Sequence, residues 1–380
     1  MKKLLITASL FWPQKNSGGP PISIMNLVQS VKDYFDIYII SNNHEIGETA
    51  PLADVKSGWN EFDFGKVYYI DSGLHTIKNV LSIIEEVSTD VIYQNSFFSH
   101  NDLIPVLLYK RKHKKSVKVI VAPRGEFYPE RIKCGAAKKK MYGLAFRLSG
   151  LLKDVYFQGT GEDECAQEHE FLKIPQSHLL NIQNLSVVSD KDIPEIPKHA
   201  GELRLVYIAR IHPTKNTLSA IEWLAEVEGN VTYDIYGSTE NAEYWDKCKE
   251  AIAKLPENIK VNYGGMVEHD DVAKMISGYH AYYMPTTGEN FGHSIVEAML
   301  VGRPVVISDQ TPWTDTDGIG GYALPLSDKD GFVKALNDLC SMENEMYAKL
   351  CSGAKEYINN KLNTKEIIKD YVKAFGGDVQ

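Results

Sequence analysis

Long apolar runs are missing from this sequence, since no uninterrupted stretch approaches the roughly 20 residues that a membrane-spanning helix needs. Cysteine is also scarce, with five residues that are widely spaced and form no C-x-x-C pair. An odd number at this spacing argues against a disulfide framework or a zinc site and is typical of ordinary thiols in a reducing compartment. We therefore expect a cytoplasmic protein.

The amino terminus, MKKLLITASLFWP, resembles a secretory signal only superficially. Two lysines precede a short apolar run, but no small-residue cleavage site follows and the chain leads into a glycine turn. A first buried β-strand explains the pattern better.

Signals for nucleic acid and for metal are also lacking. No recognisable nucleic-acid motif is present and the pI of about 5.7 is acidic, so nucleic acid is not an expected partner. The triplet Asp315-Thr316-Asp317 does not stand in the strand–loop context of a metal-binding D-x-D, and we interpret it as a loop. We expect no metal and no organic cofactor.

The length of 380 residues, with 43% hydrophobic and 24% charged residues, indicates a globular protein of two domains. Residues 186–202 are polar and contain two prolines, which is typical of a linker. We therefore place a first domain at 1–185 and a second at 203–363. Residues 364–380 carry a final helix pattern.

Short β-like runs alternate with helical patterns in both domains. In the first domain the runs are residues 2–10, 36–41, 66–71, 90–95, 118–123 and 154–159. In the second they are residues 203–211, 231–237, 259–265, 280–286, 304–309 and 320–326. This rhythm predicts two α/β, Rossmann-like domains with doubly wound parallel sheets, which bind ligands at the carboxyl ends of their strands. Two such domains joined by one hinge predict a cleft between those edges.

Residues 285–309, PTTGENFGHSIVEAMLVGRPVVISD, place Glu289 and Glu297 eight positions apart, around the start of an apolar helix. The N–H groups at a helix start suit phosphate, and carboxylates accept hydrogen bonds from sugar hydroxyls. Together they describe a pocket for a nucleotide-sugar. An alternative is an S-x-x-E capping box, in which Ser294 caps the helix and Glu297 reaches back to its start.

Two basic side chains follow the first strand of the second domain. Arg210 and Lys215 lie between that strand and the helix pattern of residues 217–227, where two cations can neutralise a diphosphate. Considered alone, an Arg and a Lys at these positions are more often surface charges.

The whole of E-N-F-G-x-x-x-x-E-A-M-x-x-G-x-P-V-V resembles the E-x7-E signature of retaining family-4 glycosyltransferases of the GT-B fold. Residues 209–216, ARIHPTKN, resemble the G-R-x-x-x-x-K-N motif of the same family, with Ala209 in place of the usual glycine. The resemblance implies metal-independent transfer from a nucleotide diphosphate sugar, with UDP favoured. It also implies that the final helix packs back on the first domain.

The resemblance assigns roles to the donor-side residues. Glu297 would bind the ribose and Glu289 the transferred sugar, while Arg210 and Lys215 would stabilise the leaving diphosphate. The backbone of residues 290–292 would orient sugar and phosphates. These three residues are Asn290, Phe291 and Gly292.

Gly18 and Gly19 follow the first strand and precede a helix pattern, which by itself indicates only a turn. Their spacing is not that of the dinucleotide fingerprint. The family resemblance implies that this loop closes over the donor phosphates.

Arg124 follows the predicted strand of residues 118–123, at a place where many family members have a histidine. The segment resembles a subgroup with P-R-G-x-x-x-P. A guanidinium stays charged, so Arg124 would hold the acceptor or a phosphate and not act as a base. The alternative is a salt bridge to Glu126 or Glu130. Asn95 and His100 follow another predicted strand and are further acceptor-side candidates.

The net charge of −9 conceals a basic zone at residues 110–153, with fourteen Lys or Arg against two Glu, a balance of +12. Apolar residues are interspersed in its second run, 131–153. This composition indicates peripheral contact with an anionic membrane surface, or a phosphate-bearing partner. A solvated charged helix is the alternative.

The sequence therefore predicts a glycosyltransferase that acts on a saccharide or lipid-linked acceptor in bacterial surface polysaccharide or glycolipid assembly. Two alternatives stay open: a nucleotide-sugar 2-epimerase of the same fold, and a non-catalytic nucleotide-sugar-binding protein.

Overall fold

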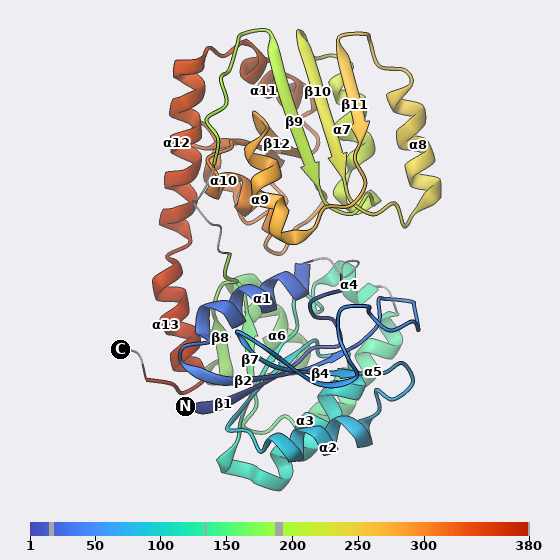
Figure 1. The fold of residues 1–380 in the computed structure, drawn as a ribbon, viewed down its shortest axis with the longest axis vertical. Coiled ribbons are helices and arrows are strands. Elements are labelled where there is room, and N and C mark those ends of the chain that lie inside the picture. Colours follow the sequence, from blue (N-terminus) through green and yellow to red (C-terminus); the bar gives the residue numbers. More distant parts are fainter. Residues whose placement is uncertain (15–18, 134, 187–192, 379–380) are drawn as a thin grey trace. The chain divides into compact units, whose positions relative to one another are not determined.

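The computed structural model describes residues 1–14, 19–133, 135–186 and 193–378. The chain forms two units (Figure 1). Unit 1 comprises Met1–Leu185 and Thr364–Gln380, and unit 2 comprises Ser186–Asn363. The final segment of the chain thus belongs to unit 1.

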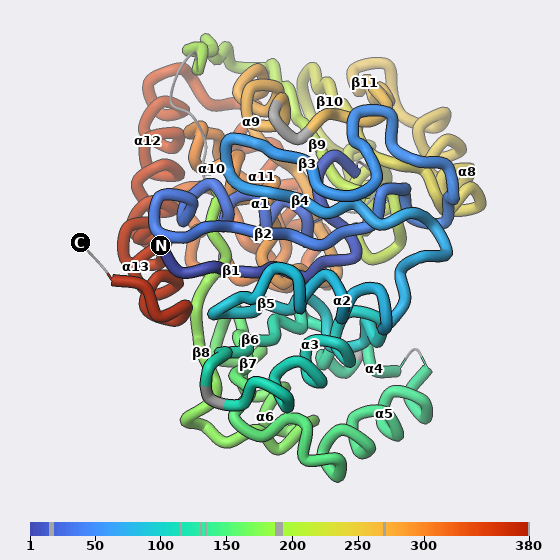
Figure 2. The backbone as a smooth tube through the Cα atoms, turned by 60° about the horizontal axis from the view of Figure 1, so that its bottom comes forward, coloured from blue at the N-terminus to red at the C-terminus, as the bar shows by residue number. Residues whose placement is uncertain are grey.

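Unit 1 contains an eight-stranded sheet in the order β3-β4-β2-β1-β5-β6-β7-β8 among its described residues (Figure 2). Neighbouring strands run parallel except β3 and β4, which are antiparallel. The strands are β1 (Lys2–Thr7), β2 (Phe35–Asn42), β3 (Gly58–Phe62), β4 (Gly65–Ile70), β5 (Val91–Asn95), β6 (Lys118–Ala122), β7 (Tyr156–Gly159) and β8 (Leu179–Asn181).

The helices of unit 1 begin and end at local signals. Thr76 caps α2 by accepting the N–H of Asn79, and Ser88 ends that helix in the left-handed conformation. The helices are α1 (Gly19–Val31), α2 (Ile77–Val87), α3 (His100–His113), α4 (Pro129–Lys133), α5 (Ala136–Ser149), α6 (Glu162–Leu172) and α13 (Thr364–Ala374), with single turns η1 (Lys114–Ser116) and η2 (Gln176–His178).

Helix α13 packs into unit 1 through aromatic contacts. Phe375 meets Phe35 edge-on at 5.7 Å between ring centroids, and Tyr371 meets Tyr93 at 6.4 Å. The Lys2 ammonium donates to the carbonyl of Gly376 at 2.6 Å.

Unit 2 contains a six-stranded parallel sheet in the order β11-β10-β9-β12-β13-β14. Strands β12 and β13 are buried at every position, because helices cover both faces of the sheet there. The strands are β9 (Glu202–Ile208), β10 (Asn230–Tyr236), β11 (Ile259–Tyr263), β12 (Ala281–Met284), β13 (Val305–Ser308) and β14 (Gly321–Leu324). The helices are α7 (Thr217–Leu224), α8 (Ala242–Ile252), α9 (His269–Ser277), α10 (His293–Leu300), α11 (Lys329–Ser341) and α12 (Asn344–Lys361), with turns η3 (Pro213–Lys215) and η4 (Thr314–Thr316).

Residues 193–201 of the predicted linker pack on the rest of unit 2. The buried Lys198 ammonium donates to the carbonyls of Cys340 at 2.9 Å and Met342 at 3.2 Å. The Arg303 guanidinium donates to the carbonyl of Pro194 at 2.7 Å. These bonds hold residues 194–198 against the end of α11 and against the segment before β13.

The predicted fold class is confirmed: both units are α/β with parallel sheets, apart from the antiparallel edge strand β3, and each predicted β-like run overlaps a strand. Two short edge strands, β3 and β8, are additions to the prediction. Their outer neighbour is missing, so they lack the continuous apolar pattern that identified the central strands.

Candidate donor-binding site

The order in which the chain adds strands to the unit 2 sheet reverses between β9 and β12, which are parallel neighbours. From β9 the chain adds β10 and β11 on one side, and it then returns to place β12 on the other side of β9. In open α/β sheets ligands bind at the carboxyl ends of the strands at such a switch point. The segment after β9 carries Arg210 and Lys215, and the segment after β12 carries Glu289.

Lys215 and Glu289 form an ion pair at this point. Their side chains are 16% and 13% exposed, so the pair is largely shielded but reachable. Backbone bonds hold the two segments together, because the carbonyl of Thr214 accepts the N–H of Thr287 at 2.8 Å and the hydroxyl of Thr286 at 2.9 Å. An ammonium has three donors, so Lys215 can bond a ligand oxygen while it keeps Glu289.

Trp313 holds the loop between Glu289 and α10 in place. The indole N–H of Trp313 donates to the carbonyl of Phe291 at 2.6 Å, and the two rings meet edge-on at 5.5 Å. Gly292 has φ +74° and forms the N-cap of α10. Residues 290–292 therefore lead directly into a helix N-terminus, where phosphate is favoured.

The capping box considered for Ser294 is not formed. Helix α10 begins at His293, so Ser294 lies inside its first turn. The Ser294 hydroxyl instead hydrogen-bonds the Tyr282 hydroxyl at 2.7 Å.

Glu297 lies on α10 and is 5% exposed. Burial raises the pKa of its carboxyl to about 8. Burial also raises the pKa of Tyr282, to which the nearby charges of Glu289 and Glu297 contribute. Tyr282 thus stays protonated between the two glutamates.

Arg210 is placed differently from Lys215. Its guanidinium is 47% exposed and lies 3.8 Å from the carboxylate of Glu240. The described residues show no contact between Arg210 and Glu289. Arg210 therefore lies in the same segment as Lys215 but is more exposed to solvent.

The acceptor-side candidates in unit 1 are partly brought together. The Arg124 guanidinium donates to Asn95 Oδ1 at 3.1 and 3.0 Å, to the Tyr93 hydroxyl at 3.1 Å, and to Asn184 Oδ1. All three acceptors are neutral. His100 is exposed in the first turn of α3, and within the described ranges no contact joins it to Arg124 or Asn95.

The salt bridge considered between Arg124 and Glu126 is not formed. The Glu126 carboxylate accepts the N–H of Phe97 at 2.6 Å and the hydroxyl of Ser96 instead. The positive charge of the Arg124 guanidinium is therefore not balanced by the Glu126 carboxylate. Gly19 is the first residue of α1, while Gly18 lies outside the described residues.

Two buried carboxyl groups on α6 lie near the same edge of the unit 1 sheet. Glu164 accepts the backbone N–H of Thr160 at 2.9 Å and that of Gly125. Glu168, one turn further along, is fully buried, and neither of its carboxyl oxygens has a hydrogen-bond partner among the described residues. Burial, and the neighbouring charge of Glu164, raise the pKa of Glu168 to about 9.

Relative to the wild type, Glu168→Gln is expected to become progressively more stable as the pH rises. A raised folded-state pKa means that the folded protein binds more protons than the unfolded chain between about pH 4.5 and pH 9, so wild-type stability falls across this window. Glutamine removes this dependence. Melting temperatures from pH 6 to pH 8.5 check it, with the exposed Glu170→Gln on the same helix as control; equal slopes for wild type and Glu168→Gln would contradict the assignment.

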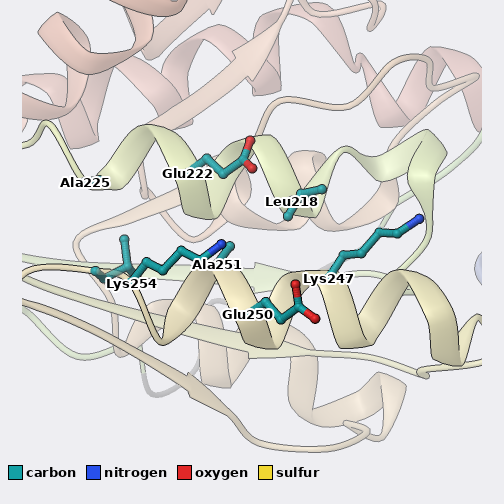
Figure 3. Close-up of a pocket in the computed structure, with 8 residues that line it drawn as sticks. Leu218, Glu222, Ala225, Lys247, Glu250, Ala251 and Lys254 are labelled. Atoms are coloured by element: carbon teal, nitrogen blue, oxygen red, sulfur yellow. The ribbon is translucent and has the colours of Figure 1, made fainter.

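A surface groove of about 310 Å³ lies elsewhere in unit 2, between α7 and α8 (Figure 3). Leu218 and Glu222 of α7 face Lys247 and Glu250 of α8 across it, and Lys254 lies just beyond the end of α8. Its charged groups stand on the solvent faces of the helices and do not converge. The strand-end geometry, and not this groove, identifies the site.

Sequence reasoning missed the residues that support the donor loop. Trp313, Thr214 and Gln310 act through the indole N–H or through carbonyl groups, which carry no sequence signature of function. The only local feature of the sequence that points to this support is the Thr311-Pro312-Trp313 segment after β13. Throughout the described ranges, no group of three His, Cys, Asp or Glu side chains is placed to hold a metal ion.

Residues 188–357 match the family model for glycosyl transferases group 1. The match covers most of unit 2, including Lys215, Glu289 and Glu297. Over these residues, unit 2 is similar to group 1 glycosyl transferases. The fold of the two units together is GT-B.

Alr3699/HepE from Anabaena, solved with UDP and glucose, is similar in structure to this GT-B chain, with a TM-score of 0.71 and 15% sequence identity over 98% of this chain and 99% of that one. The UDP-N-acetylglucosamine–peptide N-acetylglucosaminyltransferase GtfA subunit of Streptococcus agalactiae is 27% identical over 37% of this chain. This chain covers only 31% of that relative's length. An uncharacterized 41.2 kDa protein in the cps region of Klebsiella pneumoniae is 23% identical over 75% of this chain and 78% of its own length.

Proposed function

We propose that this protein is a retaining, metal-independent glycosyltransferase that moves a sugar from a UDP-sugar to an acceptor hydroxyl. The observation that carries the proposal is the contact of Lys215 with Glu289 beside the N-terminus of α10. A cation, a carboxylate and helix N–H groups offer complementary partners to a diphosphate and a sugar. The UDP named for Alr3699/HepE and for the streptococcal relative supports the choice of base.

Each donor-side residue has a distinct role in this proposal. Lys215 and Arg210 stabilise the negative charge that develops on the leaving diphosphate. Glu289 accepts hydrogen bonds from the transferred sugar, and Glu297 accepts them from the ribose. The backbone of Asn290, Phe291 and Gly292 orients the sugar and phosphates.

The chemistry needs no protein nucleophile. The bond between the anomeric carbon and the diphosphate oxygen breaks, and a bond to the acceptor oxygen forms on the same face of the sugar. The acceptor proton passes to the departing phosphate oxygen. Retention follows from this same-face attack.

We assign the acceptor to unit 1, with Arg124 and Asn95 at its sheet edge and His100 at the start of α3. The neutral acceptors around Arg124 hold the guanidinium in place and leave its charge available to an anionic acceptor. A saccharide or lipid-linked acceptor of a surface polysaccharide or glycolipid fits this charge, and the Klebsiella relative from a cps region supports that setting. Gly18 and Gly19 are proposed to approach the donor phosphates.

A two-step assay tests the proposal. Thermal shifts with a panel of nucleoside diphosphates and their sugars identify the donor, because a ligand that binds the folded state raises the melting temperature. Sugar transfer from that donor to saccharide and lipid-linked acceptors is then followed by mass spectrometry. Sugar isomerisation without an acceptor would indicate the epimerase, and binding without any turnover would indicate a binding protein.

Donor affinity is expected to rise with pH up to about pH 8. Sugar hydroxyls donate to the ionised form of Glu297, whereas burial keeps this carboxyl protonated below its pKa of about 8. Binding must therefore release a proton at lower pH, and the affinity falls by up to about tenfold for each unit of pH below 8. Calorimetry with UDP-sugar between pH 6 and pH 9 measures this slope.

Glu297→Gln is the matched control, since it keeps the shape of the side chain and cannot titrate. Its affinity should be lower and independent of pH over the same range. A wild-type profile that is flat, or that falls as pH rises, would contradict the role of Glu297.

A further inference from the structure

Helix α5 exposes a row of apolar side chains. Met141, Leu144 and Leu148 are 68%, 49% and 79% exposed, and Ala137 and Ala145 are exposed among them. At 100° per residue these five positions occupy a sector of about 100° around the helix. Single exposed apolar residues are ordinary, but a continuous row indicates an interaction surface.

The opposite face of α5 is already packed. The rings of Tyr142 and Phe146 contact Phe97 at 5.6 and 5.4 Å between centroids. A side chain at Gly143 would stand 2.6 Å from the ring of Phe171, so α5 lies close against α6 at this point. The helix therefore cannot rotate to bury Met141, Leu144 and Leu148.

Basic side chains border the apolar row on both sides. By the same helical geometry, Lys138 lies at one edge and Lys140 and Arg147 lie at the other. All three are exposed, and no described carboxylate pairs with them. Residues 135–153 contain no Asp or Glu at all.

The other basic run of unit 1 is used differently. The Lys110 ammonium donates to the carbonyls of Lys114 at 2.7 Å and Val117 at 2.6 Å, at the end of α3. Lys112 pairs with Glu85 at 2.7 Å. These bonds give Lys110 and Lys112 local structural roles, so the candidate for an interaction surface within the basic zone is α5.

We propose that the α5 surface, formed by Met141, Leu144, Leu148, Lys138, Lys140 and Arg147, docks on a bilayer that contains anionic lipid. The apolar row enters the boundary between headgroups and acyl chains, while the basic edges contact lipid phosphates. An apolar centre with two cationic edges and no acidic residue fits a lipid surface better than a protein partner. No helix in the described part of the chain is long and apolar enough to span the membrane, so contact would be peripheral.

Vesicle flotation with the full chain tests this proposal, using phosphatidylcholine with and without about one third phosphatidylglycerol. The wild type should bind the anionic vesicles, and salt should weaken the binding. The triple variant Lys138→Gln, Lys140→Gln, Arg147→Gln should lose roughly a hundredfold in partitioning, since each cation near an anionic surface contributes roughly fivefold. The double variant Met141→Gln, Leu148→Gln should lose at least about tenfold.

The double variant Ile319→Gln, Met346→Gln is the matched control, because it removes two apolar side chains that are 52% and 62% exposed in unit 2. It should bind vesicles as the wild type does. Absence of vesicle binding by the wild type, or binding unchanged in the α5 variants, would overturn the proposal. Self-association of the wild type that the α5 variants abolish would also overturn it, because the surface would then join two copies of the chain. Donor binding is measured separately and does not depend on the result.

Discussion

Lys215→Ala is expected to reduce sugar transfer by about 10²- to 10³-fold or more while the protein stays folded, and Glu289→Ala to do the same. A preorganised charge near a leaving group contributes several kcal/mol to transition-state stability, and we propose that the diphosphate and the sugar meet at the Lys215–Glu289 pair. Initial rates with the identified donor measure the loss, and circular dichroism checks the fold. Near-normal turnover by either variant would refute the site assignment.

The exchange Lys215→Glu with Glu289→Lys separates a structural role from a functional one. It restores an ion pair of opposite orientation, so the stability lost in the single variants should largely return. Transfer should stay abolished, because a carboxylate now faces the diphosphate. Recovery of both stability and activity would mean that the pair only holds the two segments together.

Gly237→Ala is expected to destabilise unit 2 by about 3 kcal/mol or more and to displace the segment that carries Arg210. Gly237 has φ +141°, and an added Cβ would stand 1.9 Å from the carbonyl oxygen of Ala209. That backbone cannot yield easily, because the N–H groups of Ala209 and Ile211 bond to the segment around Gly237. Urea unfolding followed by tyrosine and tryptophan fluorescence measures the change.

Gly265→Ala is the control for this close approach. Gly265 also has a positive φ, +78°, but an added Cβ would meet no atom within 4 Å. Only the conformational cost of about 1 kcal/mol should appear. Equal effects of the two substitutions would show that backbone conformation alone, and not contact with Ala209, requires Gly237.

The sequence was sufficient to predict the strands other than the short edge strands β3 and β8, and to predict the order of the donor-side segments. Continuous apolar runs identify strands such as β12, which are covered on both faces. The spacing of Glu289 and Glu297 correctly placed a helix start between them, although the cap is Gly292 and not Ser294. A cap depends on the φ of one residue, which a pattern of residue types does not determine.

Long-range partners could not be predicted. The sequence indicates only nearby carboxylates as partners of Arg124, yet its guanidinium bonds Asn184, sixty positions away. The same holds for Trp313, which supports the donor loop through the carbonyl of Phe291. The composition of the sequence reveals the basic zone of residues 110–153. Only the structure distinguishes the exposed α5 surface from Lys110, which bonds carbonyl groups at the end of α3.

The central claim is that a donor site lies at the carboxyl ends of the strands in unit 2. Calorimetric titration of the full chain with UDP-sugars tests this claim most directly. We predict saturable binding of one donor per chain, weakened at least about tenfold by Lys215→Ala and by Glu297→Gln, and unchanged by Glu250→Gln in the groove between α7 and α8. Absence of saturable binding to any nucleoside diphosphate sugar, or binding that the first two substitutions leave unaltered, would contradict it.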